Sequence, residues 1–187
     1  MDWIAFSLLL LASFAAGATG VIFKPGDWYL SLQKPSFTPP NWAFPVVWTT
    51  LYIMMALAGG RAVAVGGPLL GLGMALWAAQ IAFNTLWTPV FFGAHRIRLG
   101  MAIIILLWLL VAVDMVVMWR IDWLTGMLLV PYLAWVTVAA ALNAGIWRLN
   151  PTALKRSATP CSLEPVVSRV YARPRCKRPR MRMQWHR

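Results

Sequence analysis

The chain has 187 residues, of which 60% are hydrophobic and 12% charged, and its formal net charge is +12. With a mean hydropathy of +0.67, it is too apolar for an ordinary soluble domain, in which about a quarter of the residues are charged. It also contains 12 tryptophans. Tryptophan gathers where one end of a side chain is wet and the other apolar, or where a flat ring lines a pocket. The composition therefore predicts a membrane protein whose aromatic rings either lie at the membrane interface or line a ligand pocket.

Five apolar stretches are each long enough to cross a bilayer, which takes about 20 residues of helix. None of them alternates polar and apolar residues with the period of two that a membrane-spanning strand requires. The predicted fold is therefore all-α, an integral membrane bundle of five transmembrane helices in one domain of residues 1–150. In chain order, the predicted helices cover residues 3–23, 43–65, 68–93, 99–119 and 123–148.

The segment of residues 24–42, between the first two predicted helices, is much longer than the other links. It contains four prolines and four aromatic residues: Pro25, Pro35, Pro39 and Pro40 with Trp28, Tyr29, Phe37 and Trp42. A flexible, solvated linker would instead be rich in Gly and Ser. The composition favours a stiff, ordered lid lying on the bundle. The alternative is a loop whose aromatic side chains only rest at the membrane interface.

Small residues recur every four positions along the third predicted helix, at Gly67, Gly71, Ala75 and Ala79. A row of small side chains lets two helices approach closely, which is how helices associate in lipid. The row predicts either a homodimer interface or a contact with another helix of the same subunit. A similar ridge on residues 12–20 of the first helix leaves both interpretations open.

Polar and aromatic residues also recur at helical spacing on three of the predicted helices. The second helix carries Trp48 and Tyr52, the third Gln80, Asn84, Trp87 and Phe91, and the fifth Trp135, Ala139 and Asn143. At about 1.5 Å of rise per residue, these three faces meet at similar depths, beneath the proline-rich loop. They predict either a pocket with indole walls for a flat aromatic ligand, or packing between helices alone.

The Lys and Arg residues of the bundle are unevenly divided between its two ends. Arg61 and Arg120 lie at the end that also carries the N-terminus. The other end holds five: Lys24, Lys34, Arg96, Arg98 and Arg148. Because Lys and Arg collect on the cytoplasmic side of membrane proteins, we expect the N-terminus outside and the C-terminus in the cytoplasm.

The last 37 residues differ in composition from the rest of the chain. Residues 1–150 hold seven Lys/Arg against four Asp, whereas residues 151–187 hold ten Lys/Arg against one Glu. The latter predict a basic, disordered C-terminal tail, which either rests on anionic lipid headgroups or has no function. Because the basic charge belongs to the tail, no nucleic-acid partner is expected. The tail also contains both cysteines, Cys161 and Cys176, interpreted as free thiols.

Residues suited to conventional catalysis are scarce. The sequence shows no Ser–His–Asp set, no phosphate-binding loop and no paired carboxylates, and neither His95 nor His186 has a second ligand at metal spacing. Acid–base or metal catalysis is therefore not expected, and no metal site is predicted. Asp114 is the one acid within a predicted span. It is either a proton-relay group, or a carboxyl that is protonated or that reaches Arg120 or water at the interface.

Several separate motifs follow one another along the chain. They are KPSFTPPNW at residues 34–42 with VWTTLY at 47–52, FNTLWTPVFFG at 83–93, and PYLAW at 131–135 with Leu142-Asn143. Together they resemble the tryptophan-rich sensory protein and translocator protein family, also called TspO/MBR or peripheral-type benzodiazepine receptor. The resemblance covers about residues 1–150 and leaves out the tail.

The resemblance implies a bundle, usually a homodimer, that binds porphyrins, sterols and benzodiazepine-type ligands beneath its first loop. The expected ligand is protoporphyrin IX or a haem-related porphyrin, and no cofactor is required. Trp48 and Trp135 correspond to tryptophans implicated in light-dependent porphyrin breakdown, and Ala139 to an alanine whose enlargement alters binding. The predicted ligand-binding residues are Trp42, Trp48, Tyr52, Gln80, Asn84, Trp87, Phe91, Trp135, Ala139 and Asn143.

Two positions depart from the family pattern. Ala144 stands where the cholesterol motif of the animal members needs a Tyr, and Phe37 stands where the pocket loop often has Trp. Three functions follow as hypotheses: a porphyrin-binding protein for tetrapyrrole sensing, transport or disposal, a light-dependent porphyrin-degrading enzyme, and a regulatory or assembly protein that acts without ligand.

Overall fold

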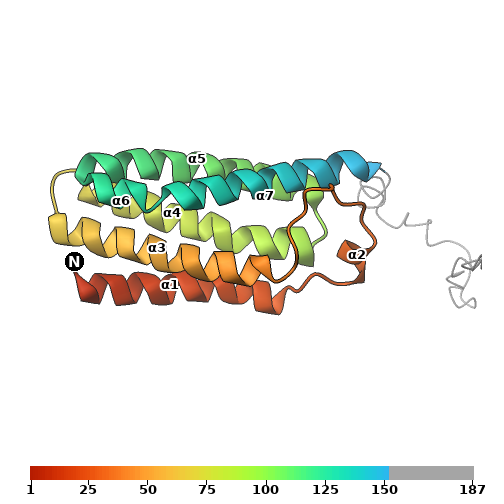
Figure 1. Ribbon diagram of the computed structural model, residues 1–187, viewed down its shortest axis with the longest axis horizontal. Coiled ribbons are helices and arrows are strands. Elements are labelled where there is room, and N and C mark those ends of the chain that lie inside the picture. Colours follow the sequence, from red (N-terminus) through yellow and green to blue (C-terminus); the bar gives the residue numbers. More distant parts are fainter. Residues whose placement is uncertain (152–187) are drawn as a thin grey trace, which may run out of the picture.

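The computed structural model describes residues 1–151. Five long helices run back and forth along one axis and form a single bundle (Figure 1). They are α1 (Trp3–Ile22), α3 (Ala43–Val65), α4 (Leu70–Thr88), α5 (Ile97–Ile121) and α7 (Val130–Leu149). Within residues 1–151 there is no strand, so the predicted all-α membrane bundle is confirmed. The predicted basic tail and its two cysteines lie outside the described residues.

Four segments are long and apolar enough to cross a membrane: Trp3–Ile22, Ala43–Val65, Ile97–Ile121 and Trp123–Leu149. Helix α4 is less apolar because it carries Gln80 and Asn84, both of which are buried inside the bundle. Helical structure is what a bilayer requires, since every backbone N–H and C=O must find a partner within its own segment. The chain is therefore a multi-pass membrane protein.

Prolines divide two of the predicted helices. The third predicted helix is α4 followed by a π-helical segment, η1 (Pro89–Gly93), which begins at the proline. The fifth consists of the short helix α6 (Trp123–Met127) and α7, and Pro131 lies in the first turn of α7. A proline lacks the N–H that a helix interior needs but fits its first turn. The helix is therefore interrupted just before Pro131, between α6 and α7, and does not continue through it as one bent helix.

Helices α1 and α3 approach closely at the N-terminal end of the bundle. At the N-terminal end, Asp2 caps α1 by accepting from the Ala5 N–H, and its own N–H donates to the Gly60 carbonyl at 3.0 Å. A Cβ on Gly60 would lie 2.9 Å from the Asp2 carbonyl oxygen, so this contact requires glycine. At the opposite end, the second half of α1 and the first half of α3 border a cavity.

An ion pair joins α3 to α6 at the end remote from the cavity. Arg61 donates from Nε to Asp122 Oδ2 at 2.5 Å and from Nη2 to Oδ1 at 3.1 Å. Asp122 also accepts from the Thr125 N–H and so caps α6. The Arg61 hydrogen bond lowers the pKa of Asp122 to about 2. Asp114, by contrast, is buried without a partner for Oδ1 in residues 1–151, and its predicted contact with Arg120 is absent from that range.

The row of small residues on the third predicted helix is shorter than expected. Gly67 has φ +102° and lies in the turn before α4, so its inclusion in the row was wrong. Gly71 and Ala75 are exposed and Ala79 is half-buried, and nothing lies within 4 Å of a Cβ built on Gly71. The remaining row faces outward, which argues against a contact within the subunit.

Candidate functional site

A cavity of about 860 Å³ lies between the helices at the end of the bundle that carries residues 24–42. This volume is within the range of about 300–1,000 Å³ that is typical of small-molecule sites. Helices α1, α3, α4, α5 and α7 all contribute to its walls, and the loop contributes to its mouth. The cavity therefore joins segments that are distant in the sequence.

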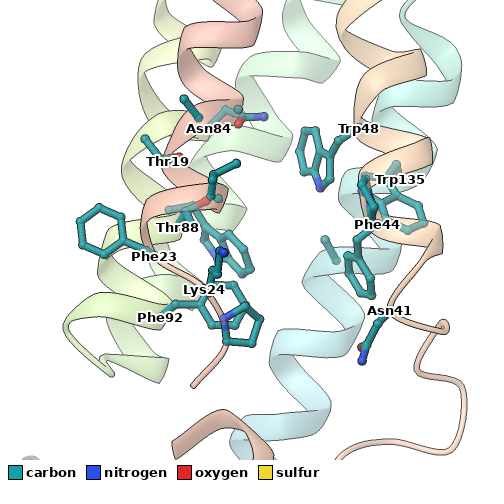
Figure 2. A pocket seen from close by; sticks show the side chains of 18 of the residues that line it. Thr19, Phe23, Lys24, Asn41, Phe44, Trp48, Asn84, Thr88, Phe92 and Trp135 are labelled. Carbon is teal, nitrogen blue, oxygen red and sulfur yellow. The ribbon is translucent and has the colours of Figure 1, made fainter. Parts of the chain in front are cut away.

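Nine of the 27 residues that line the cavity are aromatic. Figure 2 shows Trp48, Trp135 and Phe44 on one side, facing Asn84 on the other. Phe44 packs edge-on against Trp135, with ring centroids 5.7 Å apart, and Trp48 lies against Tyr52 at 5.4 Å. These contacts hold the rings in place. The indole walls suit a flat, apolar ligand, because aromatic faces stack on one another.

A buried hydrogen-bond network stands behind the cavity wall. Asn84 donates from Nδ2 to the Tyr132 hydroxyl at 3.1 Å, and that hydroxyl donates to Gln80 Oε1 at 2.8 Å. Tyr132 and Gln80 are almost fully buried, whereas Asn84 reaches the cavity. The network therefore fixes the orientation of the Asn84 amide.

Two further polar groups belong to residues that line the cavity. The indole Nε1 atoms of Trp87 and Trp135 are buried and have no acceptor within residues 1–151. A buried donor without a partner costs about 1–3 kcal/mol. Both indoles could recover this energy by donating to a polar atom of a ligand. The site thus combines large apolar rings with a few directed donors, as ligand pockets generally do.

The mouth of the cavity is positively charged. Lys24 and Lys34 are among the residues that line it, and none of the Asp residues in the described range, 1–151, does so. The Lys34 ammonium lies 4.5 Å from the centroid of the Tyr29 ring, a cation–π contact. Burial raises the pKa of the Tyr29 hydroxyl, so Tyr29 adds no negative charge there. A ligand with an anionic group would find its counter-charges at the loop end.

The loop that forms the mouth packs on the bundle. It contains the short helix α2 (Asp27–Leu30), where Trp28 stacks on His95 with ring centroids 4.3 Å apart. Leu32 is buried in a second apolar cluster with Phe91, Ile97 and Ile146. The loop is therefore ordered and lies on the bundle, although Phe37 and Trp42 are exposed. Whether it closes over a ligand as a lid stays a prediction.

Six of the ten predicted ligand-binding residues line the cavity: Trp48, Tyr52, Asn84, Trp87, Trp135 and Ala139. Four do not. Trp42 is 70% exposed beside the start of α3, and Gln80 is buried behind the wall. Phe91 is buried against Trp87, and Asn143 is buried near Gly100 of α5, with both amide atoms unpartnered in residues 1–151.

For two of these four residues, Asn143 and Phe91, helix geometry explains why they do not line the cavity. A step of four residues advances about 400° around an α-helix, so a row spaced by four drifts about 40° per step. Over the two steps from Trp135 to Asn143, the row turns away from the cavity and toward α5. At Phe91 the π-helical turn of η1 changes the phase again, since its repeat differs from that of the α-helix.

Sequence reasoning missed the contribution of α1 and of the two lysines. Phe14 of α1 lines the cavity and packs edge-on against Tyr52, and Gly17 lies where a Cβ would be 2.6 Å from Tyr52 Cε2. Helix α1 carries a ridge of small residues over positions 12–20, but that pattern did not distinguish a cavity wall from a contact between helices. Lys24 and Lys34 were used only to orient the chain in the membrane.

The fold and the cavity define a class: a multi-pass helical membrane protein with an aromatic internal cavity beneath its first loop. The profile of the TspO/MBR family matches residues 5–148. The chain therefore belongs to the TspO/MBR family, and the resemblance noted from its motifs is confirmed.

Named relatives cover nearly the same part of the chain. Protein CrtK of Rhodobacter capsulatus is 54% identical over 153 residues, which span 81% of this chain and 96% of the relative. The tryptophan-rich sensory protein of Cereibacter sphaeroides is 46% identical over 80% of this chain and 94% of its own length. The human translocator protein is 33% identical, with corresponding shares of 79% and 91%.

Proposed function

We propose that the protein binds a porphyrin, such as protoporphyrin IX or a haem-related tetrapyrrole, in its aromatic cavity. The observation that supports this most directly is the division of the cavity into indole walls and a mouth with two lysines. A porphyrin has the matching form, since its flat ring is apolar and its propionate groups are anionic. Its ring would lie against Trp48 and Trp135, and its propionates near Lys24 and Lys34.

Binding of this kind serves tetrapyrrole sensing, transport or disposal, the role we assign to the protein. Sterol-like and benzodiazepine-type molecules are secondary ligands, because the same walls accept other apolar rings. A sterol would bind without the cholesterol motif of the animal members, since Ala144 stands at its Tyr position.

A titration of the purified protein with protoporphyrin IX tests the proposal. We expect saturable quenching of tryptophan fluorescence at micromolar ligand, and at least tenfold weaker binding by Ala139→Phe, because the new ring would occupy the cavity. Val138→Phe is the matched control, since Val138 is exposed on the same helix. Equal, unsaturable quenching in all three proteins would refute porphyrin binding and favour the ligand-independent role.

Light-dependent porphyrin breakdown is the second candidate, because Trp48 and Trp135 both line the cavity. In this reaction the porphyrin would be oxidised and dioxygen reduced, with the two indoles carrying electrons between the excited porphyrin beside them and dioxygen. The test is a new absorbing product that forms under light and is lost in Trp48→Phe and Trp135→Phe but retained in Trp147→Phe, a change outside the cavity. Product that forms equally in every variant would indicate simple photobleaching.

We also propose a homodimer in which the outward-facing row Gly71, Ala75 and Ala79 of α4 meets its copy, with membrane lipid covering the other apolar faces.

In the membrane, the N-terminus would face outward and the C-terminus would face the cytoplasm. The distribution of Lys and Arg supports this orientation, because the cavity end holds five of the seven in residues 1–150. Cysteine labelling from either side of sealed vesicles tests it.

A further inference from the structure

The side chain of Asn150 forms hydrogen bonds with the first loop, at a residue 117 positions earlier in the sequence. Asn150 lies at the C-terminal cap of α7 and is only 9% exposed. Its Oδ1 accepts from the Gln33 N–H at 3.0 Å, and its Nδ2 donates to the Gln33 carbonyl at 2.9 Å. Nδ2 also donates to the Ile146 carbonyl at 2.8 Å, which fixes the amide against its own helix.

The two hydrogen bonds between Gln33 and Asn150 differ from the other hydrogen bonds of the loop in joining residues that are distant in the sequence. Within residues 1–151, the other hydrogen bonds of residues 24–42 join neighbours in the loop or form the turn into α3. Among the hydrogen bonds within residues 1–151, only the pair between Gln33 and Asn150 joins the loop to a distant part of the bundle. Figure 1 shows the loop crossing from the end of α1 to the end of α7 before it returns to α3.

Packing on either side of Gln33 supports the same attachment point. Leu32 is buried against Ile146 and its neighbours. On the other side, a Cβ on Gly145 would overlap Pro35 Cγ, so the loop lies directly on the backbone of α7. The attachment therefore consists of one bidentate amide pair between two apolar contacts.

The attachment point lies within the part of the loop that borders the cavity. Tyr29 and Leu30 precede it, Lys34 follows it directly, and all three line the cavity. If Gln33 left Asn150, the Lys34 ammonium and the Tyr29 ring would move with the loop backbone. The cavity mouth would then widen.

We infer that Asn150 is a latch: it holds the first loop shut over the cavity and so sets the rate at which ligand is exchanged. It is a positioning residue, because it reaches the ligand only through Gln33 and the loop. The role of Asn150 in ligand exchange rests on the proposed porphyrin function, whereas its attachment of the loop does not.

The test compares the full-length wild-type protein with Asn150→Ala and Asn150→Asp in lipid nanodiscs. The Asp variant keeps the acceptor for the Gln33 N–H but places a second oxygen against the Gln33 and Ile146 carbonyls. We expect hydrogen exchange at the Gln33 amide to rise about tenfold in both variants, the change that corresponds to about 1.4 kcal/mol of lost hydrogen bonding. The dissociation rate of protoporphyrin IX should rise by a similar factor.

Two further variants separate the latch from a general loss of stability. Gly145→Ala leaves Asn150 intact but pushes against Pro35, and it should accelerate both exchange at Gln33 and porphyrin release. Thr137, also on α7, accepts a hydrogen bond from Trp108 Nε1, and this bond involves no loop residue. Thr137→Val removes it and should change neither the exchange rate at Gln33 nor the rate of porphyrin release.

Each outcome bears on a distinct statement. Exchange at Gln33 that stays slow in Asn150→Ala would overturn the latch. Faster exchange with unchanged porphyrin release would show that the loop does not gate the cavity. If the wild-type protein bound no porphyrin, the proposed function would fail, and the exchange measurement would still decide the attachment.

Discussion

The amide of Asn84 donates a hydrogen bond of 3.1 Å to the hydroxyl of Tyr132, and this contact connects the cavity wall to the buried polar groups of the bundle. The Tyr132 hydroxyl in turn donates a hydrogen bond to Gln80 Oε1. Because an apolar membrane interior offers no water to replace such bonds, each of the three groups depends on the others.

Tyr132→Phe should therefore destabilise the bundle although it deletes a single oxygen. The change leaves Gln80 Oε1 and Asn84 Nδ2 without partners in residues 1–151, and a buried unsatisfied group costs about 1–3 kcal/mol. We expect a loss of about 2 kcal/mol in the free energy of unfolding, measured by denaturant titration in mixed micelles. Thr50→Val is the control, because Thr50 is exposed and bonds only to Val46 of its own helix. Equal stability of both variants would show that the network contributes little.

The two lysines at the cavity mouth should distinguish anionic ligands from neutral ones. The double variant Lys24→Met, Lys34→Met keeps apolar stems of similar length but removes both charges. We expect it to bind protoporphyrin IX about tenfold more weakly, because charge-assisted contacts contribute about 1.5–3 kcal/mol. Its affinity for the dimethyl ester should match that of the wild-type protein. Arg120→Met, at the opposite end of the bundle, serves as control, and an equal loss for acid and ester would refute a role in charge recognition.

The helices could be predicted from the sequence because the bilayer requires about 20 apolar residues in each span. Much of the cavity followed from rows spaced by four, and Trp48, Asn84 and Trp135 indeed line it. The same rule failed for Asn143 and Phe91, where helical drift and a π-turn changed the direction of the side chain. Local spacing carries no information about these rotations.

The rest of the site depends on contacts between distant residues. Gly17 lies against Tyr52, yet the ridge of small residues on α1 does not indicate which side chain it will contact. Asn150 and Gln33 are 117 residues apart, and neither belongs to a recognisable motif. Such pairs are decided by how the helices pack, which residue spacing along one helix does not determine.

The ion pair between Arg61 and Asp122 should make stability depend on pH in a narrow acidic range. Its hydrogen bond lowers the pKa of Asp122 to about 2, whereas an unfolded Asp titrates near about 3.9. The contribution is therefore fully present above about pH 4 and is lost as the pH falls toward about 2. We expect the difference in unfolding free energy between wild type and Asp122→Asn to be constant from pH 7 to about pH 5. It should then shrink to nearly zero by about pH 2. A difference that does not change with pH would contradict a charged pair.

The outward row of small residues on α4 predicts the effect of bulk at a dimer interface. Small side chains let two helices approach closely in lipid, and Ala75 is exposed on the surface of the single subunit. Ala75→Trp should therefore prevent association while the subunit still folds, which can be measured as a shift from dimer to monomer by single-molecule photobleaching in bilayers. Leu106→Trp adds similar bulk at an exposed site on α5 and should leave the dimer intact. If dimers persisted in Ala75→Trp but were lost in Leu106→Trp, the result would contradict an interface on α4 and indicate one on α5.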